Sequence, residues 1–259
     1  MNKILKNDWE FNVLNIYNYN KPGPFSSYFE FIKKNHKKLS GDLLEAGVHK
    51  GKSLLSVALY LKEIGSKKKV YGYDSWAGFP KNQKNNSMDH FLRWKDLLKK
   101  KDISKSHYGD VLKNRKFISF LKKKNDDKIN SYNLSTSGDF SNCSIIELQE
   151  KIKFLKLDNI ILIKGDFKKT LINKNKKFKD LFAAIIDADL YSSYNIALPF
   201  IWGNLVKNGF LFLDEYYSLK FPGARIACNN FFKNINSKPK KIKQAKGDFE
   251  RWYVKKLIK

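Results

Sequence analysis

The stretch Asp42–Gly51 reads Asp-Leu-Leu-Glu-Ala-Gly-Val-His-Lys-Gly, and it decides the fold. A short apolar run ends at Glu45 and is followed by Gly47 and Gly51. The next segment, Ser53–Leu61, is strongly apolar, as expected of a helix that packs on a sheet. Strand, glycine turn and helix in this order open a βαβ unit. The stretch therefore predicts the first unit of a parallel sheet.

Later apolar runs also end at polar or glycine-rich points, and we predict four strands from them: Val70–Asp74, Asn159–Lys164, Leu181–Ile186 and Phe210–Leu213, the last introduced by a turn at Asn208-Gly209. Continuous apolar runs are typical of a parallel sheet that is covered on both faces. Lys241–Lys256 predicts two closing antiparallel strands around Gly247-Asp248 at the sheet edge. Together these patterns predict a doubly wound, Rossmann-like α/β fold with a mostly parallel sheet of about seven strands and helices on both faces.

The segment Lys81–Asp158 interrupts this rhythm of strands and helices. It contains two predicted helices, Asp89–Lys100 and Ser144–Leu157, and polar loops near Lys122–Asp139. An insertion beside a binding rim is typical of a lid, although its middle portion fits a surface excursion without a role equally well. A further helix is predicted at Ala224–Asn234. Without an internal repeat or a linker, residues 1–259 are expected to form one domain with this insertion.

The composition indicates a globular intracellular protein. Of the 259 residues, 42% are hydrophobic, which is enough for a core and excludes wholesale disorder. The two cysteines, Cys143 and Cys228, are too few for a disulfide framework or a zinc site. No secretory signal is recognisable, and no apolar run reaches the roughly 18 residues of a membrane span. A cytoplasmic location without a membrane span is therefore expected.

The formal net charge of +26 is the extreme value in the sequence. Such a charge is compatible with attraction to nucleic acid, an anionic membrane or a phosphorylated substrate. However, the excess is mostly lysine that is scattered through the loops, with few arginines for bidentate contacts to phosphate or bases. It is also not interleaved with aromatic residues along one track. We therefore favour a compositional origin and do not expect nucleic acid as a partner.

The glycine turn and the strand after it predict a nucleoside site. Glu45-x-Gly47-x-x-x-Gly51 differs from the dinucleotide fingerprint, because an acid replaces its first glycine and the spacing is longer. Gly47 allows a ligand to approach the backbone, and Gly51 opens the helix N-terminus. Asp74 closes the next strand, about 20 residues beyond the turn, where an acid binds ribose hydroxyls. The alternative for Asp74 is a helix N-cap.

A second group of acids follows two later strands. Asp187 and Asp189 leave one strand, and Asp214 and Glu215 leave the next. Carboxylates that point at one spot repel each other unless a positive charge lies between them, and a set of oxygen ligands without histidine favours a hard cation such as Mg²⁺. Such a cation would activate an acceptor hydroxyl. The alternatives are helix caps and surface ion pairs with lysines.

With these residues in view, the sequence resembles the macrocin O-methyltransferases, which methylate sugar hydroxyls with S-adenosylmethionine and Mg²⁺. The resemblance holds in order and approximate spacing from Asp42 to Trp252. It rests on five stretches: Gly41–Gly51 (without His49), Tyr71–Pro80, Lys164–Leu171, Asp187–Ser193 and Pro222–Arg225.

The resemblance implies roles for ten residues. The cofactor would be bound by Glu45, Gly47, Gly51, Asp74, Ser75, Asp166 and Asp187, with Asp166 near the adenine. The cation would be held by Asp189, Asp214 and Glu215, with Asp189 also acting as the general base.

Two departures from the family pattern affect these roles. Glu215 stands where the family usually has aspartate, and His49-Lys50 replaces its aromatic-Arg pair. No acceptor contact transfers from the family, and neither His90 nor His107 is assigned a role.

The sequence thus predicts an S-adenosylmethionine-dependent O-methyltransferase that acts on a small-molecule or glycan acceptor. Methylation of another hydroxyl, as in a catechol or RNA, is an alternative, as is a non-catalytic binding module on a methyltransferase fold. A homo-oligomer also remains open.

Overall fold

A computed structural model describes residues 3–84, 86–172, 180–243 and 249–257 of the chain. Its centre is a seven-stranded sheet in the order β3-β2-β1-β4-β5-β7-β6. The strands are β1 (Asp42–Ala46), β2 (Val70–Asp74), β3 (Ile160–Lys164), β4 (Leu181–Ile186), β5 (Leu205–Leu213), β6 (Lys240–Lys241) and β7 (Trp252–Lys255). The first five are parallel, β7 runs antiparallel to β5, and β6 antiparallel to β7. The predicted mostly parallel Rossmann-like sheet is confirmed.

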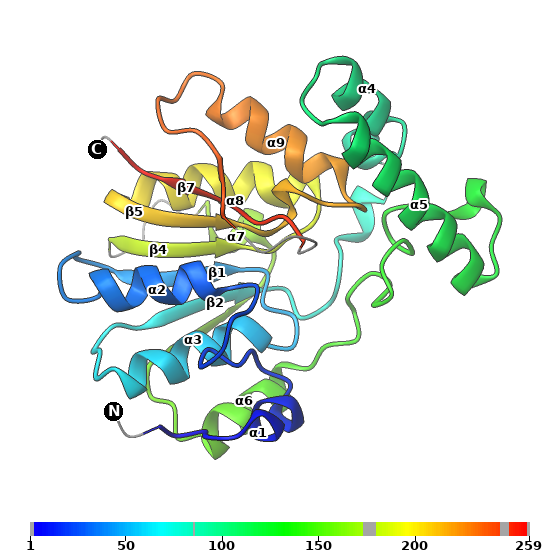
Figure 1. Ribbon diagram of the computed structural model, residues 1–259. Helices are drawn as coiled ribbons and strands as arrows, with labels where there is room; N and C mark the ends of the chain where they lie inside the picture. Colours follow the sequence, from blue (N-terminus) through cyan, green and yellow to red (C-terminus); the bar gives the residue numbers. More distant parts are fainter. Residues whose placement is uncertain (1–2, 85, 173–179, 244–248, 258–259) are drawn as a thin grey trace.

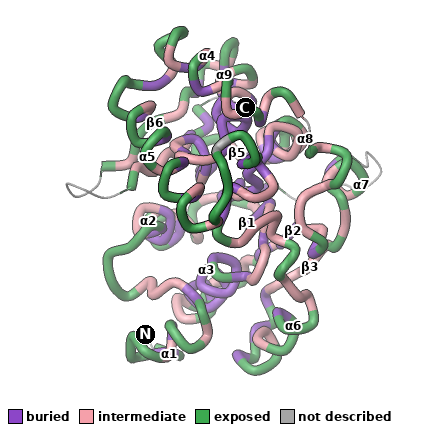
Figure 2. Tube along the Cα trace, turned by 90° about the vertical axis from the view of Figure 1, so that its right-hand side faces the viewer, coloured by how far each residue is buried: buried purple, intermediate pink, exposed green. Residues whose placement is uncertain are grey.

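Helices cover both faces of this sheet (Figure 1). One face packs against α1 (Asp8–Leu14), α2 (Ser26–Asn35), α3 (Lys52–Glu63) and α6 (Ile145–Phe154). The other packs against α7 (Phe167–Thr170), α8 (Tyr191–Asn204) and α9 (Pro222–Phe232). All six residues of β4 are buried, because this strand has helices on both sides. Figure 2 shows the same pattern, with buried residues along the sheet and on the helices beside it.

The insertion forms a smaller helical layer at one end of the sheet (Figure 1). It contains η1 (Lys81–Gln83), η2 (Ser87–Asp89), α4 (Arg93–Lys99), α5 (Lys105–Lys122) and η3 (Asp126–Lys128) before α6. Trp94 and Leu97 of α4 form a buried cluster with Val111 of α5, and Ile226 of α9 packs against it. The insertion is therefore attached to the helix that follows the last parallel strand.

Several sequence predictions need correction. The helix predicted at Asp89–Lys100 begins at Arg93, because a 3-10 turn and a bend precede it. The helix predicted at Ala224–Asn234 begins earlier, at Pro222, whose fixed φ suits the first helical turn. The long helix α5 was not predicted, and neither were α1, α2, α7 and α8.

The fifth strand also differs from the prediction. It begins at Leu205 and not at Phe210. Asn208 has a φ of +63° inside β5, and the pairing with β4 jumps from Leu181↔Leu205 to Ala183↔Phe210. The predicted turn is therefore an irregularity within a longer strand. The closing antiparallel pair is confirmed, while its Gly247-Asp248 turn lies outside the described residues.

In the described part of the chain, no helix is both long and apolar enough to cross a lipid bilayer.

Candidate active site

A cavity of about 390 Å³ lies at the carboxyl ends of the parallel strands. This volume is in the usual range for small-molecule sites. The cavity brings together six of the predicted site residues: Gly47, Asp74, Ser75, Asp166, Asp187 and Asp189. They come from the ends of β1, β2, β3 and β4, as the rule for ligand sites in open α/β sheets requires.

The turn after β1 depends on its first glycine. Gly47 has a φ of +90°, and a Cβ built on it would lie 1.7 Å from the carbonyl oxygen of Asp187. Only glycine permits the turn to approach β4 this closely. Gly51 has a different role, because it precedes α3 and packs against Leu148 of α6, and it is not among the residues that line the cavity.

Asp74 fixes this glycine turn from the neighbouring strand. Its Oδ2 accepts hydrogen bonds from the backbone N–H groups of Val48 (2.7 Å) and His49 (2.8 Å). Its Oδ1 accepts one from Trp76, at 2.7 Å. A carboxylate offers about four acceptor positions, so Asp74 retains capacity for a ligand in the cavity.

Glu45 lies behind the cavity and does not line it. Its side chain is buried, its Oε1 accepts a 2.6 Å hydrogen bond from the Ser53 hydroxyl, and its Oε2 has no partner among the described residues. Burial is the main cause that raises the pKa of Glu45 to about 8; the Ser53 bond opposes it, and the negative charges of Asp74 and Asp214 contribute to the rise. Glu45 is therefore a buried acid beneath the glycine turn.

The far end of the cavity is formed by Asp166 and by aromatic side chains. Asp166 caps the short helix α7 by accepting a 2.8 Å hydrogen bond from the backbone N–H of Lys168. Phe79, in the loop that follows β2, and Phe140, in the insertion, line the cavity, and their ring centroids lie 5.2 Å apart. The insertion thus forms one wall of the site.

Next to this cavity, three carboxylates converge. One oxygen from each of Asp187, Asp214 and Glu215 lies within 4.8 Å of the others, and we call these residues the acid triad. Ile186 pairs with Leu213, so the acids that follow β4 and β5 lie side by side. Burial and neighbouring negative charges, including those within the triad, raise the pKa of Asp187 and of Glu215 well above their ordinary values.

Asp189 stands beside the triad. It has a φ of +57°, which is uncommon for a residue with a side chain, and it lines the cavity. Burial raises the pKa of Asp189 to about 8, and the charge of Asp214 contributes while Lys220 opposes it. Asp187, which the resemblance assigned to the cofactor, is therefore a member of the acid triad. Asp189 lies beside the triad and lines the cavity.

Comparison with known proteins gives the family. The family described as macrocin-O-methyltransferase (TylF) matches residues 119–249, half of the chain. The chain belongs to the macrocin O-methyltransferase family. It is an S-adenosylmethionine-dependent O-methyltransferase by this membership, as the sequence predicted. No match was found among curated protein sequences.

Solved structures of methyltransferases share the fold. The O-methyltransferase NovP matches with a TM-score of 0.58 at 15% identity, over 96% of this chain and 80% of NovP. The calicheamicin methyltransferase CalS11, also described as a TDP-rhamnose 3'-O-methyltransferase, has a TM-score of 0.58 at 16% identity, over 95% and 90%. An O-methyltransferase from Bacillus cereus in complex with SAH gives 0.51 at 10% identity, over 97% and 93%.

In this methyltransferase, the hydroxyl of Tyr194 in α8 contacts Glu215 of the triad, a role that the sequence did not reveal. Its hydroxyl lies 2.7 Å from Glu215 Oε2 and 3.0 Å from the carbonyl oxygen of Ile186, and it accepts a 3.2 Å hydrogen bond from the Glu215 N–H. The tyrosine is fully buried. The longer side chain of Glu215 is thus held by a specific partner.

Asp89 is a second residue whose role the sequence did not reveal. This buried acid of the insertion accepts a 2.9 Å hydrogen bond from the backbone N–H of Tyr191, at the start of α8. Burial raises the pKa of Asp89 to about 6. A Cβ on Gly223 would lie 2.0 Å from Asp89 Oδ1, which explains the glycine in the Pro-Gly-Ala-Arg motif. Asp89 therefore connects the insertion to the segment that carries Asp189.

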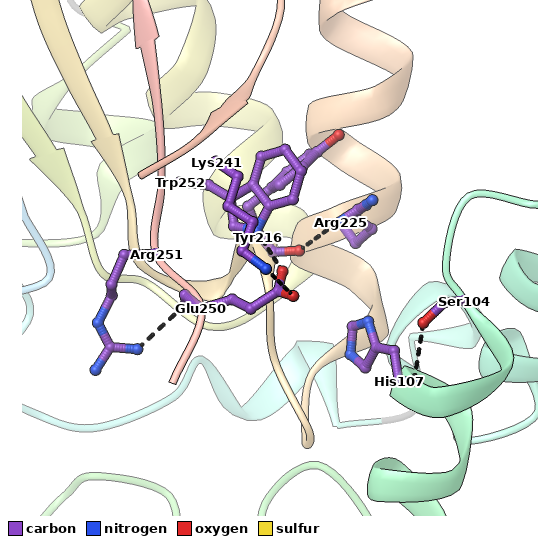
Figure 3. Close-up of polar contacts among 8 residues, drawn as sticks. All are labelled: Ser104, His107, Tyr216, Arg225, Lys241, Glu250, Arg251 and Trp252. Atoms are coloured by element: carbon purple, nitrogen blue, oxygen red, sulfur yellow. Dashed lines mark hydrogen bonds and ion pairs between the residues drawn. The ribbon is translucent and has the colours of Figure 1, made fainter. Parts of the chain in front are cut away.

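Arg225 makes a second connection to the insertion, and Figure 3 shows its contact with Tyr216. This buried arginine of α9 donates to the carbonyl oxygens of Tyr216 (2.8 Å) and Asp102 (2.5 Å), and its guanidinium stacks 3.8 Å from the Tyr216 ring. Trp252 of β7 lies on the same group, at 5.4 Å. Arg225 thus joins η4 (Asp214–Tyr216), which carries two triad acids, to the insertion and the sheet edge.

The two unassigned histidines have local roles in this structure. His107 is buried, its Nε2 lies 2.7 Å from the carbonyl oxygen of Ser218, and its ring stacks on Tyr217 at 4.1 Å. His90 is exposed, and its Nδ1 accepts a hydrogen bond from the N–H of Leu92. Neither histidine lines the cavity.

Proposed function

We propose that this enzyme transfers a methyl group from S-adenosylmethionine to a hydroxyl of a sugar or a glycosylated small molecule, with help from a divalent cation. The observation that carries the proposal is the acid triad, whose oxygens lie within 4.8 Å of one another beside a cavity of nucleoside size. Two comparisons support a sugar acceptor: the chain belongs to the macrocin O-methyltransferase family, and CalS11, which shares the fold, is described as a TDP-rhamnose 3'-O-methyltransferase.

For the cofactor, we assign the ribose to Asp74, the methionine end to the turn at Gly47, and the adenine to the region of Asp166. The arrangement of these residues around one cavity supports the assignment. Ser75 lines the same cavity and is assigned to the cofactor as well, whereas Asp187, which also lines it, is assigned to the acid triad. Glu45 and Gly51 lie behind its lining, so we assign them indirect roles in shaping the glycine turn. The loop after β2, through Phe79, and the insertion, through Phe140, would cover the bound molecule.

For the cation, the chemistry of the acid triad fits a hard divalent ion such as Mg²⁺. Oxygen ligands suit this ion, and the raised pKa values of Asp187 and Glu215 indicate carboxylates that lack compensating positive charge. We propose that Asp214 and Glu215 hold the cation together with a carboxylate from the Asp187–Asp189 segment. When bound, the cation would lower the pKa of an acceptor hydroxyl, and the sulfonium of the cofactor would supply the methyl group.

The remaining chemistry falls to Asp189, which lines the cavity beside the triad. We propose that its carboxylate accepts the proton of the acceptor hydroxyl as general base. The oxygen then forms a bond to the methyl carbon while the carbon–sulfur bond breaks and sulfur keeps the electron pair. Burial raises the pKa of Asp189 toward the neutral range, which suits a general base.

The test of this function is transfer of labelled methyl groups from S-adenosylmethionine to nucleotide sugars and to a glycan extract of the host. The proposal expects a labelled sugar O-methyl ether. Label found in RNA or in a catechol, with none in the sugar fraction, would replace the proposed acceptor class. Binding of the cofactor without transfer to any of these acceptors would favour a non-catalytic role.

A further inference from the structure

The outer face of α5 exposes three large apolar side chains next to each other. Phe117, Phe120 and Leu121 are 55%, 81% and 65% exposed. Positions three and four apart lie on one side of a helix, so these residues form one apolar surface, which we call the α5 tip. Large adjacent apolar groups on a surface mark an interaction site.

The α5 tip is not the face by which α5 packs on the rest of the protein. The opposite side of the same helix is already packed, since Ile118 forms a buried cluster with Ile129 and Leu134. Arg115 is also buried on that side, where its Nη2 donates to the carbonyl oxygen of Ile129 (3.1 Å) and its guanidinium lies 4.0 Å from the Phe91 ring. The helix is therefore held by its inner face, and the tip is presented outward.

The charges around the tip select the kind of partner. Residues 111–125 contain five lysines, one arginine and no acid, and they are flanked by Asp110 on one side and Asp126-Asp127 on the other. Lys113 and Lys116 are exposed on the helix, with the Lys113 Nζ 5.8 Å from the centre of the Phe117 ring, and Lys123 and Lys124 follow the helix end. Two copies of a chain with a net charge of +26 would repel each other at such a surface. A partner that complements this surface must therefore be both apolar and negatively charged.

We infer that the α5 tip docks on the surface of an anionic lipid bilayer. Phe117, Phe120 and Leu121 enter the boundary between headgroups and acyl chains, and the surrounding lysines contact lipid phosphates, with their stems along the apolar layer. The enzyme has no need to span the membrane in this arrangement. Reversible attachment of this kind requires both an apolar and a basic contribution, and the tip combines them.

The position of the tip connects the membrane to the catalytic rim. The first turns of α5 contact that rim, where His107 stacks on Tyr217. Phe120 lies about 20 Å further along the helix, at 1.5 Å per residue. In Figure 1, α5 extends away from the sheet at the end of the molecule where the insertion lies. Docking of the tip would therefore hold the rim close to the bilayer.

The experiment is co-sedimentation of the full chain with vesicles of phosphatidylcholine, with and without phosphatidylglycerol. Binding is expected only with the anionic lipid. A triple variant, Phe117→Ser, Phe120→Ser and Leu121→Ser, should lose at least about tenfold in partitioning, because the apolar contribution is gone. A double variant, Lys113→Gln and Lys116→Gln, should lose roughly thirtyfold, since each lysine near an anionic surface contributes about 1 kcal/mol.

Matched controls distinguish the α5 tip from a general effect of exposed apolar area. Trp9→Ser with Val13→Ser removes two exposed apolar groups of α1 and should leave vesicle binding unchanged. Methyl transfer to a soluble acceptor should be the same in the α5 variants, since none of these residues lines the cavity. Equal binding to both vesicle types, or none to either, would overturn the inference. If light scattering instead revealed a dimer that the triple variant abolishes, or RNA bound the tip in place of lipid, the surface would have another partner.

Discussion

The two acidic regions of the rim differ in how their charge is compensated. Asp74 at the end of β2 accepts three backbone hydrogen bonds, from Val48, His49 and Trp76. The acid triad at the ends of β4 and β5 combines three carboxylates within 4.8 Å, and burial with mutual repulsion raises the pKa of Asp187 and Glu215. Asp74 thus completes a local structure, whereas the triad leaves a demand for positive charge.

This difference separates binding from chemistry. A carboxylate that accepts several backbone hydrogen bonds is held in one orientation, and it is therefore suited to bind a ligand in one fixed position. Carboxylates that repel each other are suited to hold a cation and to move protons. We therefore assign the β1–β2 side of the rim to the cofactor and the β4–β5 side to the reaction, and the following predictions test that division.

The largest effect is expected at Asp189. Asp189→Asn removes the proposed base while the side chain keeps its size, so kcat should fall by about 10² to 10⁴-fold. Cofactor affinity, measured by calorimetry, should stay near that of the wild type, since Asp74 and Gly47 remain. Comparison with Asp187→Asn distinguishes base from ligand: loss of cation affinity in the Asp187 variant alone would assign Asp187 to the cation. A variant with full turnover would remove Asp189 from the mechanism.

The second effect concerns the cofactor side. Asp74→Ala removes the acceptor of three backbone N–H groups and the proposed ribose ligand. Cofactor binding should weaken by about 1–3 kcal/mol. Asp74→Asn serves as the control, since its amide oxygen can still accept from the turn. If calorimetry gives an unchanged affinity for Asp74→Ala, the nucleoside site lies elsewhere and the division of the rim is wrong.

A smaller effect is expected at Tyr194, whose hydroxyl contacts Glu215 of the triad. Tyr194→Phe removes the hydroxyl that joins Glu215 to the end of β4, and it should cost about 0.5–1.5 kcal/mol in the free energy of unfolding. Cation affinity should fall while cofactor affinity is retained. Glu215→Asp restores the family's usual residue but shortens the reach to Tyr194. Equal loss of cofactor and cation affinity in Tyr194→Phe would mean that the tyrosine supports the whole rim.

A last prediction concerns the pH dependence of stability that Glu45, between the two regions, contributes. Its pKa is about 8 in the folded protein, above the ordinary value of 4.5, so the folded state binds its proton more tightly than the unfolded state. Its contribution to stability is therefore present at low pH and declines as pH rises from about 4 to about 8. In the Glu45→Gln variant, the free energy of unfolding should decline less with rising pH. Thermal unfolding at a series of pH values, with a chelator present, measures this. An unchanged slope would exclude Glu45 as its source.

Much of the sheet was predictable from the sequence. The bounds of β1, β2 and β4 agree with their apolar runs, because a strand that is buried on both faces needs a continuous run. The helix α5 was not predicted, since Phe117, Phe120 and Leu121 are apolar on its exposed face and obscure the amphipathic pattern. In α8 the apolar residues surround the helix, and Pro199, an unfavourable residue in a helix interior, lies within it, so no period indicated a helix.

The candidate site was predictable in its acids but not in their grouping. Strand ends indicated which acids share a rim, because parallel strands end at one edge. The strand ends grouped all four acids, and the resemblance assigned Asp189, Asp214 and Glu215 to the cation. In the structure, the three whose oxygens lie within 4.8 Å of one another are Asp187, Asp214 and Glu215. Side-chain direction after a strand depends on backbone angles such as the φ of +57° at Asp189, and these follow from tertiary packing. The contacts of Tyr194, Asp89 and Arg225 are equally long-range and left no signal in the sequence.

We propose that methyl transfer depends on a cation held by the acid triad. The direct measurement is transfer of labelled methyl groups in the presence of EDTA, followed by addition of excess Mg²⁺, with cofactor affinity measured in parallel. We predict that chelation abolishes transfer, that Mg²⁺ restores it, that Asp214→Asn prevents the recovery, and that cofactor affinity changes little throughout. Full turnover in EDTA would contradict the claim and would leave Asp189 as a base that acts without a cation.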